Sequence, residues 1–291
     1  MPRRLLTLPV CALAVLLLLG LAPAALAAPG AAETRAGTAE RAAHGAAAAA
    51  TATRYVALGD SYAAGVGATP DPATGDCRRS DRSYPALWAA ENSPASFTTV
   101  ACSGATSGEV VTKQVRTVRA DTTLVTITVG GNDTGFGPVL AVCSTAPDDE
   151  SCFRAVRGGE RAARFVAPGG LISTIVGVRL QAPEAKILVL GYPRLFDAGE
   201  DCDVAGVPNA ARRAAINRGA DTLNAALADA AERFRGQFVD VRDAFEGHGI
   251  CSSAPWINPP ADPVTPSVYH PTARGYADGY LPAMTAAVTR S

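Results

Sequence analysis

The sequence is poor in histidine, and its charges nearly balance. Among its 291 residues there are 3 histidines, 26 lysines and arginines, and 27 aspartates and glutamates. Without an excess of basic residues the chain lacks the positive field that nucleic-acid binding requires, so we expect no nucleic-acid partner. Because histidines are so few, any chemistry that needs one has few candidate residues.

Long hydrophobic runs are also missing, except at the N-terminus. Arg3 and Arg4 precede an apolar stretch over residues 5–21, and Ala25-Leu26-Ala27 offers a small-x-small cleavage site. These are the parts of a secretory signal peptide, so we predict a secreted protein that is cut after Ala27. The run is short for a transmembrane anchor, and we expect no later stretch long enough to span a bilayer.

A low-complexity segment follows the predicted signal peptide. Residues 28–52 are mostly alanine, with glycine, threonine and a few charges. Such a composition cannot bury enough apolar surface to offset the entropy of ordering, so we expect a flexible leader or pro-segment. The remaining residues, 53–291, have the size of a single domain. Without Arg3 and Arg4 the chain has 24 basic and 27 acidic residues, a net charge of −3.

The cysteines form no C-x-x-C pair. Once Cys11 leaves with the signal peptide, six remain: Cys77, Cys102, Cys143, Cys152, Cys202 and Cys251. With two histidines in the same region they make a poor zinc set, so we expect no metal. An even number of cysteines in an exported chain indicates three disulfides, and six cysteines allow 15 pairings. Sequential pairing (77–102, 143–152 and 202–251) is the simplest, although the residues alone do not select it.

Apolar runs of strand length alternate with helical segments along the predicted domain. Five runs are rich in valine, isoleucine and leucine: residues 54–58, 98–101, 124–129, 186–190 and 237–241. Their nearly continuous apolar character is typical of strands covered on both faces. The clearest helices are expected over about 171–180, over about 209–234, and from about 272 towards the C-terminus. The alternation predicts an α/β fold, a parallel sheet with helices on both sides.

Polar, glycine-rich turns follow the first three predicted strands. Ser61 follows the first strand, Gly104 the second and Asn132 the third. Ligands bind beyond the carboxyl ends of the strands in open parallel sheets, so these turns are expected to converge on one edge. The first turn is neither a P-loop nor a dinucleotide fingerprint, because no lysine follows Gly65 or Gly67 and no third glycine completes G-x-G-x-x-G.

These residues suit acyl transfer with a serine nucleophile. A serine hydroxyl needs an adjacent general base, usually a histidine. His248 lies in a glycine-flanked loop, whereas His270 stands just before the last predicted helix, so we assign the base to His270. The backbone N–H groups of Ser61 and Gly104 and the side-chain amide of Asn132 are the candidate oxyanion donors. Alone, Gly104 or Asn132 would be an ordinary turn residue; their order after successive strands favours the catalytic role.

Taken together, these motifs resemble a known family. Four segments, Gly59-Asp60-Ser61-Tyr62, Gly104, Gly130-x-Asn132-Asp133 and His270, resemble in order the four blocks of the SGNH (GDSL) hydrolases, most closely the secreted lipases and esterases of actinomycetes. The resemblance implies a flavodoxin-like, three-layer α/β/α sandwich with five parallel strands and three sequential disulfides. It also implies that Ser61 is the nucleophile, that Gly104 and Asn132 are oxyanion donors, and that His270 is the base.

The sequence departs from the family pattern in front of the histidine. Many members carry D-x-x-H, but here Ser267 stands three residues before His270. Asp262 and Asp278 are the nearest acids, and neither is well placed by sequence. A histidine base still needs a partner for Nδ1–H to fix its tautomer. Our hypothesis is a Ser61–His270 dyad in which a main-chain carbonyl near Ser267 orients the ring.

The predicted function is therefore that of a secreted serine esterase or lipase without a cofactor. We expect a small-molecule or lipid ester as substrate, transient contact with a lipid surface, and a monomer. Residues 71–82 and 255–266 are expected to form rims of the site, and Trp256 is expected either to line the site or to pack in the core. Three alternatives stay open: a phospholipase or polysaccharide O-acetyl esterase using the same site, a non-catalytic binding module, and a metal-dependent hydrolase.

Overall fold

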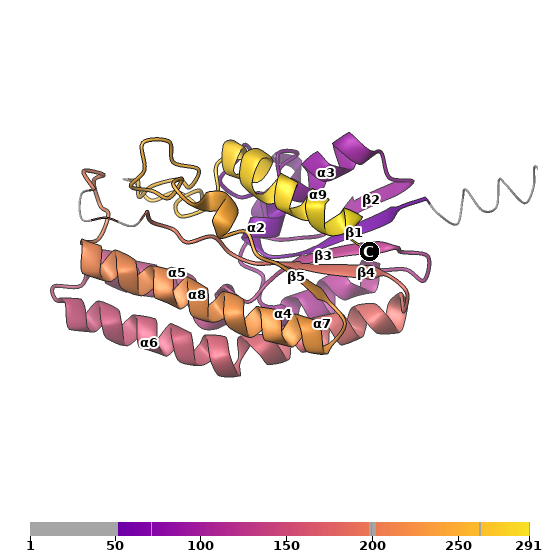
Figure 1. Cartoon of the computed structure of the whole chain (residues 1–291), viewed down its shortest axis with the longest axis horizontal. Coiled ribbons are helices and arrows are strands. Elements are labelled where there is room, and N and C mark those ends of the chain that lie inside the picture. Colours follow the sequence, from indigo (N-terminus) through magenta and orange to yellow (C-terminus); the bar gives the residue numbers. More distant parts are fainter. Residues whose placement is uncertain (1–51, 71, 198, 200–201, 262, 291) are drawn as a thin grey trace, which may run out of the picture. The chain divides into compact units, whose positions relative to one another are not determined.

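A five-stranded parallel sheet forms the centre of the computed structural model (Figure 1). The model describes residues 52–290 apart from 71, 198, 200–201 and 262. The predicted signal peptide, and residues 28–51 of the predicted leader, lie outside these described residues. The strands are β1 (Arg54–Gly59), β2 (Ser96–Thr99), β3 (Leu124–Thr128), β4 (Lys186–Leu190) and β5 (Gln237–Val239), in the spatial order β2-β1-β3-β4-β5.

The register places the carboxyl ends of β1, β2 and β3 side by side. Val56 on β1 is opposite Thr98 on β2 and Val125 on β3, and the neighbouring pairs are all parallel. The central strands β1, β3 and β4 are almost entirely buried, which explains why their sequences read as continuous apolar runs. The edge strand β2 is partly exposed and begins two residues before the predicted run 98–101.

Helices cover both faces of the sheet, as predicted. Helices α3 (Tyr84–Asn92) and α9 (Leu281–Thr289) lie on one face (Figure 1). The other face is covered by α4 (Ser107–Glu109), α7 (Ala167–Gln181) and α8 (Ala210–Arg233). Next to α8 lie α5 (Phe136–Thr145) and α6 (Asp149–Phe165). The helices expected over 171–180 and 209–234 correspond to α7 and α8. The helix expected from about 272 starts as a π-turn over Gly275–Tyr280 that leads into α9.

Capping explains where the long helix α8 begins. Asn209 is its N-cap, and the side-chain oxygen accepts the backbone N–H of Arg212 at 3.0 Å. The apolar face predicted from the sequence is the buried one, and it includes Ile216, Leu223 and Leu227. These residues anchor α8 against the sheet and against its neighbours α6 and α7.

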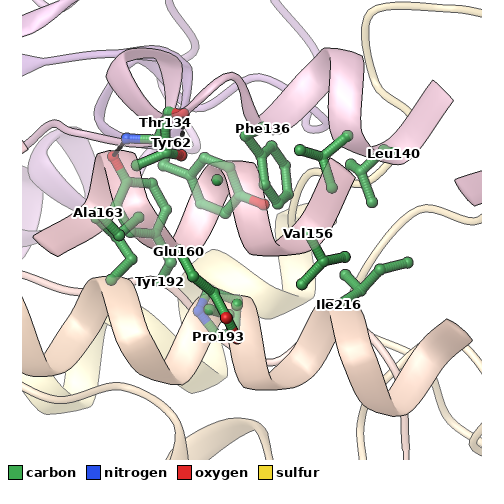
Figure 2. Close-up of a pocket in the computed structure, with 16 residues that line it drawn as sticks. Tyr62, Thr134, Phe136, Leu140, Val156, Glu160, Ala163, Tyr192, Pro193 and Ile216 are labelled. Atoms are coloured by element: carbon green, nitrogen blue, oxygen red, sulfur yellow. Dashed lines mark hydrogen bonds between the residues drawn. The ribbon is translucent and has the colours of Figure 1, made fainter. Parts of the chain in front are cut away.

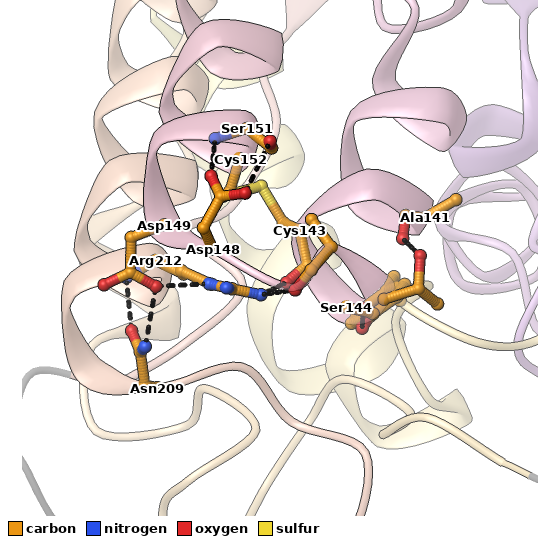
Figure 3. Close-up of a disulfide and its surroundings, with 12 residues drawn as sticks. Ala141, Cys143, Ser144, Asp148, Asp149, Ser151, Cys152, Asn209 and Arg212 are labelled. Atoms are coloured by element: carbon orange, nitrogen blue, oxygen red, sulfur yellow. Dashed lines mark hydrogen bonds and ion pairs between the residues drawn. A yellow bond between two sulfur atoms is a disulfide. The ribbon is translucent and has the colours of Figure 1, made fainter.

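Three disulfides are present among the described residues. They join Cys77 to Cys102, Cys143 to Cys152, and Cys202 to Cys251, the sequential pairs. The second ties the end of α5 to the beginning of α6, as Figure 3 shows. Beside it, Arg212 of α8 donates to the carbonyl oxygen of Cys143 (2.9 Å) and pairs with Asp149 of α6 (2.6 Å). This disulfide clamp, Cys143–Cys152 with Arg212 and Asp149, fastens α5, α6 and α8 to one another.

One described stretch is long and apolar enough to cross a membrane when judged by length and composition alone. It is Asp149–Gln181, the exception to our expectation of none after the N-terminus. The stretch consists of two helices, α6 and α7, that meet at Val166. On α7, Leu171, Ile175 and Val178 are buried in the core. A buried core helix can have the same length and apolar composition as a membrane-spanning one.

Candidate active site

Ser61 lies where β1 leaves the sheet. The strand ends at Gly59, which has a φ of +136°, and a Cβ there would overlap the carbonyl oxygen of Thr128 on β3. The buried amide of Gln114 holds this turn, accepting from Gly59 N–H (2.7 Å) and donating to Gly59 O (2.9 Å). Ser61 is the first residue of the short helix α2 (Ser61–Ala64) and is 8% exposed. The turn therefore presents the serine at the carboxyl edge of the sheet.

His270 meets Ser61 at hydrogen-bond distance. The distance from Ser61 Oγ to His270 Nε2 is 2.7 Å. Gly67 permits this approach, since its φ is +101° and a Cβ there would collide with the main chain of Pro271 and the side chain of His270. The amide of Asn258 fastens the two segments by donating to the carbonyl oxygens of Gly67 (3.1 Å) and His270 (2.9 Å). Nothing in the sequence marks Asn258 beyond its place in the loop before His270.

A main-chain carbonyl contacts the other ring nitrogen of His270. Nδ1 lies 3.0 Å from Val268 O. A carbonyl can only accept, so Nδ1 carries the proton and Nε2 is free to accept from Ser61. This corrects the prediction of Ser267, whose carbonyl instead accepts the backbone N–H of His270 at 3.0 Å. The physical reason is local: Tyr269 has a φ of +63°, so the chain turns sharply between Val268 and His270.

The acids considered as alternatives do not take this place in the described residues. Asp278 pairs with Arg274 at 2.9 Å on the exposed side of the last helical segment, and Asp262 lies outside the described residues. Burial lowers the pKa of His270 to about 4, while nearby backbone carbonyls act in the opposite direction. The ring is therefore neutral at ordinary pH, which is the state that a general base requires.

The loops after β2 and β3 carry the predicted oxyanion donors. The Asn132 side-chain Nδ2 donates to the carbonyl oxygen of Ala105 at 2.9 Å, which orients the amide and leaves its second N–H available. Gly104 is exposed with a φ of +79°, and a Cβ there would point into open space. The Asp133 carboxylate accepts the backbone N–H (3.0 Å) and the hydroxyl (2.6 Å) of Ser107, which ties the two loops together.

All four predicted residues line one cleft. Its lining includes Ser61, Gly104, Asn132 and His270, together with Ser103, Phe136 and Pro266. The cleft holds about 650 Å³ of unfilled space, part of it open to solvent. A hydroxyl, a neutral imidazole and several N–H donors around one space are the groups needed for acyl transfer.

A buried network that the sequence analysis did not identify links the nucleophile turn to the loop after β3. The Tyr192 hydroxyl donates to Asp60 Oδ2 (2.6 Å) and accepts the N–H of Gly131 (3.1 Å), while Asp60 Oδ1 accepts the N–H of Tyr62 (2.9 Å). Burial raises the pKa of Asp60 to about 7, and the hydrogen bonds from Tyr192 and Tyr62 oppose that rise. Tyr192 stands two residues after the end of β4 at Leu190, so it too lies beyond the carboxyl end of a parallel strand, where ligands bind.

Comparison with known proteins identifies the family of the chain. A family model described as the GDSL-like lipase/acylhydrolase family matches residues 57–277. The chain belongs to this family. It is 43% identical to a lipase of Streptomyces rimosus over 237 residues, covering 81% of this chain and 87% of the relative. It is 40% identical to lipase 1 of Streptomyces coelicolor over 271 residues, covering 93% and 98% of the two chains.

Solved structures of two Streptomyces enzymes agree with this chain in fold. The phospholipase A1 from Streptomyces albidoflavus NA297 superposes with a TM-score of 0.78 at 42% identity, covering 81% of this chain and 99% of that one. The extracellular lipase from Streptomyces rimosus gives 0.77 at 42% identity, covering 81% and 100%. The family resemblance and the three-layer α/β/α fold are thus confirmed, and this GDSL hydrolase is an ester hydrolase of the lipase and esterase type.

Trp256 packs in the core of this GDSL hydrolase and does not line the cleft. It is 8% exposed, and its ring stacks on that of His248 with the centroids 3.6 Å apart. His248 Nδ1 also lies 3.0 Å from Ala254 O, so this histidine packs within its own loop. Of the described residues in the two predicted rims, Pro266 lines the cleft, and none of residues 72–82 does; residues 71 and 262 lie outside the described residues.

The lowered pKa of His270 predicts that the acid limb of the pH–rate profile for hydrolysis lies at an unusually low pH. A general base works when it is neutral, so activity should fall as pH falls through the folded-state pKa. We expect the limb of kcat/KM to have its midpoint near pH 4 and not near 6.5, the usual histidine value. Rates on a neutral ester between pH 3.5 and 8 would test this.

The control for that profile is Asp60→Asn, because Asp60 is a second buried group with a pKa of about 7. The low limb should persist in this variant, whose amide keeps an oxygen for the N–H of Tyr62. A limb at pH 6.5 or above that survives the substitution would contradict the prediction. A fall in kcat/KM with a midpoint near pH 7 that is absent from Asp60→Asn would be caused by the titration of Asp60.

Proposed function

We propose that the protein is a secreted serine esterase or lipase that hydrolyses carboxylic esters through an acyl-enzyme on Ser61. The observation that carries the proposal is the 2.7 Å contact between Ser61 Oγ and His270 Nε2. It is supported by Val268 O, which holds the ring in the tautomer whose Nε2 accepts a proton. The donors of Gly104 and Asn132 line the same cleft.

In the acylation step, Ser61 Oγ attacks the ester carbonyl carbon while His270 Nε2 takes the hydroxyl proton. The carbonyl oxygen becomes an oxyanion, which accepts hydrogen bonds from the Ser61 and Gly104 N–H groups and the Asn132 amide. As the tetrahedral intermediate collapses, the bond to the alcohol oxygen breaks, and His270 returns its proton to that leaving oxygen. The alcohol departs, and the acyl group remains as an ester of Ser61.

Deacylation repeats these steps with water as the nucleophile. His270 removes a proton from water, whose oxygen attacks the acyl carbon, and the same donors stabilise the second oxyanion. The Ser61 oxygen then leaves with the proton from His270, which releases the carboxylic acid and restores the free enzyme. Through both steps the Val268 carbonyl accepts from Nδ1–H and stabilises the transient imidazolium.

Secretion is part of the proposal. It is supported by the signal-peptide pattern over residues 1–27 and by the likeness to a lipase that is described as extracellular. The six cysteines of residues 53–291 are all placed in disulfides, a use of cysteine typical of oxidising compartments outside the cytosol.

A phospholipid is the second candidate substrate. The observation that favours it is the 0.78 TM-score to a phospholipase A1 of Streptomyces albidoflavus NA297. The chemistry at Ser61 would be the same, because phospholipase A1 also cleaves a carboxylic ester. A panel of p-nitrophenyl esters and a diacyl phosphatidylcholine in vesicles would rank the two substrate classes.

Labelling with a fluorophosphonate tests the nucleophile directly. We expect one equivalent of probe on the native protein, located by mass spectrometry on the peptide that contains Ser61, and none after denaturation. Ser103→Ala is the matched control, since Ser103 lines the same cleft and should not be needed for labelling. Probe found on Ser103, or no probe on a folded and active protein, would contradict the assignment of Ser61.

A further inference from the structure

The Tyr192 hydroxyl joins the two turns that carry the nucleophile and an oxyanion donor. It donates to Asp60 Oδ2 at 2.6 Å, and Asp60 directly precedes Ser61. It also accepts the backbone N–H of Gly131 at 3.1 Å, and Gly131 directly precedes Asn132. A single oxygen atom from the loop after β4 therefore bridges the turns that follow β1 and β3.

The main chain of Tyr192 is fixed independently of those two turns. The buried side chain of Asn224 on α8 accepts the backbone N–H of Tyr192 (2.9 Å) and donates to its carbonyl oxygen (2.8 Å). A Cβ on the preceding residue, Gly191, would lie 2.4 Å from Asn224 Oδ1, so glycine is needed there. Because α8 packs against the sheet, Tyr192 is a fixed point to which both turns are attached.

The ring of Tyr192 is held in one direction. It packs edge-to-face on the ring of Tyr62, with the centroids 5.1 Å apart. Figure 2, a close-up of a pocket that both rings line, shows them side by side, with a dashed line at the Tyr192 hydroxyl for its bond to Gly131. A Cβ on Gly131 would lie 3.4 Å from the hydroxyl end of the ring, so the turn after β3 rests directly against it.

The carboxyl group of Asp60 makes one more hydrogen bond than a helix cap requires. Asp60 is the N-cap of α2, and Oδ1 accepts the N–H of Tyr62 at 2.9 Å. The side chain is buried, and none of the ion pairs among the described residues includes it. Burial of a carboxyl group without a cation is costly, and serine or asparagine would also cap the helix. The second oxygen, Oδ2, therefore points to a use in the link to Tyr192.

The link sets the spacing between the nucleophile and the oxyanion donor. Negative charge develops on the substrate oxygen between Ser61 N–H and the Asn132 amide, and a donor is most effective when it is already in place. We infer that Tyr192 is a positioning residue that holds the Asn132 turn at its working distance from Ser61; this inference rests on the proposed function. Tyr192 exchanges no proton with the substrate, because its hydroxyl is occupied by Asp60 and Gly131.

The test is Tyr192→Phe, which removes the bridging oxygen and keeps the ring that lines the cleft. Steady-state kcat and KM are measured on p-nitrophenyl butyrate. We expect kcat to fall about tenfold or more, the effect of a misplaced catalytic group, while KM changes by less than about threefold. A rise in KM with kcat unchanged would mean that the hydroxyl serves substrate binding, and it would overturn the inference.

A double-mutant cycle with Asn132→Ala tests the route of the effect. Without the Asn132 amide, Tyr192 has no side-chain donor to place. In the Asn132→Ala background, Tyr192→Phe should therefore lower kcat by less than about threefold. A general loosening of the fold would lower kcat by the same factor in both backgrounds, and that result would overturn the inference.

Tyr55→Phe is the matched control. Tyr55 is also buried, on the strand that leads to Ser61, and its hydroxyl bonds to Thr126 Oγ1 at 2.7 Å, outside the lining of the cleft. The loss of this bond should lower the stability to denaturant and leave kcat within about twofold of the parent value. An equal fall in kcat in both tyrosine variants, or an unchanged kcat in folded Tyr192→Phe, would overturn the inference.

Asp60→Asn takes the place of Tyr192→Phe if that variant does not fold. The oxygen of the new amide can serve Tyr62, but its NH₂ group then faces the Tyr192 hydroxyl, which has lost its acceptor. The fall in kcat should again shrink in the Asn132→Ala background, and a fall that does not shrink would overturn the inference. Fluorophosphonate labelling of Ser61 in a folded Tyr192→Phe protein with the parent kcat would leave the proposed function standing and remove the inference alone.

Discussion

Replacement of Ser61 by alanine is expected to lower kcat for ester hydrolysis by about 10⁶-fold, the scale seen when a serine nucleophile is removed from a serine–histidine unit. The loss follows from the 2.7 Å contact, because His270 Nε2 would have no hydroxyl to activate. Some rate above that in water should remain, since the donors of Gly104 and Asn132 would still stabilise an oxyanion formed by direct attack of water.

The same variant should fold normally. The backbone of Ser61 holds the turn, because its carbonyl oxygen accepts the N–H groups of Gly65 (3.1 Å) and Val66 (3.0 Å), and alanine keeps both bonds. Steady-state rates on p-nitrophenyl butyrate and a thermal unfolding curve would check the two expectations together. Ser103→Ala should keep most of the activity. A folded Ser61→Ala protein with more than about a hundredth of the parent rate would rule out the acyl-enzyme mechanism.

The placement of the site could be predicted because it follows from strand order. Ser61, Gly104 and Asn132 come soon after apolar runs, and the carboxyl ends of parallel strands share one edge. The structure brings these residues and His270 around one cleft. Burial on both faces made the runs of β1, β3 and β4 visible in the sequence, whereas the exposed edge strand β2 carried a weaker signal and was displaced by two residues.

Details that depend on single torsions and side-chain directions could not be predicted. The carbonyl behind His270 belongs to Val268 and not to Ser267 because of the positive φ of Tyr269, an angle that no local motif announces. The bridge from Tyr192 to Asp60 spans 132 positions of the chain, so a tyrosine hydroxyl had to be located in space before its role was apparent.

Helices α5 and α6 were not among the helices predicted from the sequence. Helix α6 carries many charged residues and the pair Gly158-Gly159, and glycine in a helix interior weakens the pattern by which a helix is recognised.

Replacement of Asn132 by alanine is expected to lower kcat by about 10²–10³-fold, the usual cost of one oxyanion-hole donor. The amide is held by Ala105 O at 2.9 Å, so its free N–H is already oriented when negative charge develops on the substrate oxygen. Interactions that strengthen in the transition state lower kcat when lost, whereas uniform binding interactions raise KM. The expected pattern is therefore a fall in kcat with a change of less than about threefold in KM.

The stability of this variant needs a separate measurement. Asn132→Ala also removes the hydrogen-bond donor to the carbonyl oxygen of Ala105, a buried residue. An acceptor left without its partner costs about 1–3 kcal/mol of unfolding free energy. Asn217→Ala is a matched control: its amide donates to the carbonyl oxygen of Phe196 at 2.8 Å, outside the lining of the cleft. Both variants should unfold at lower denaturant concentration, but the large fall in kcat should appear in Asn132→Ala alone. A rise in KM with kcat unchanged would place the Asn132 amide on the bound ester and not on the oxyanion.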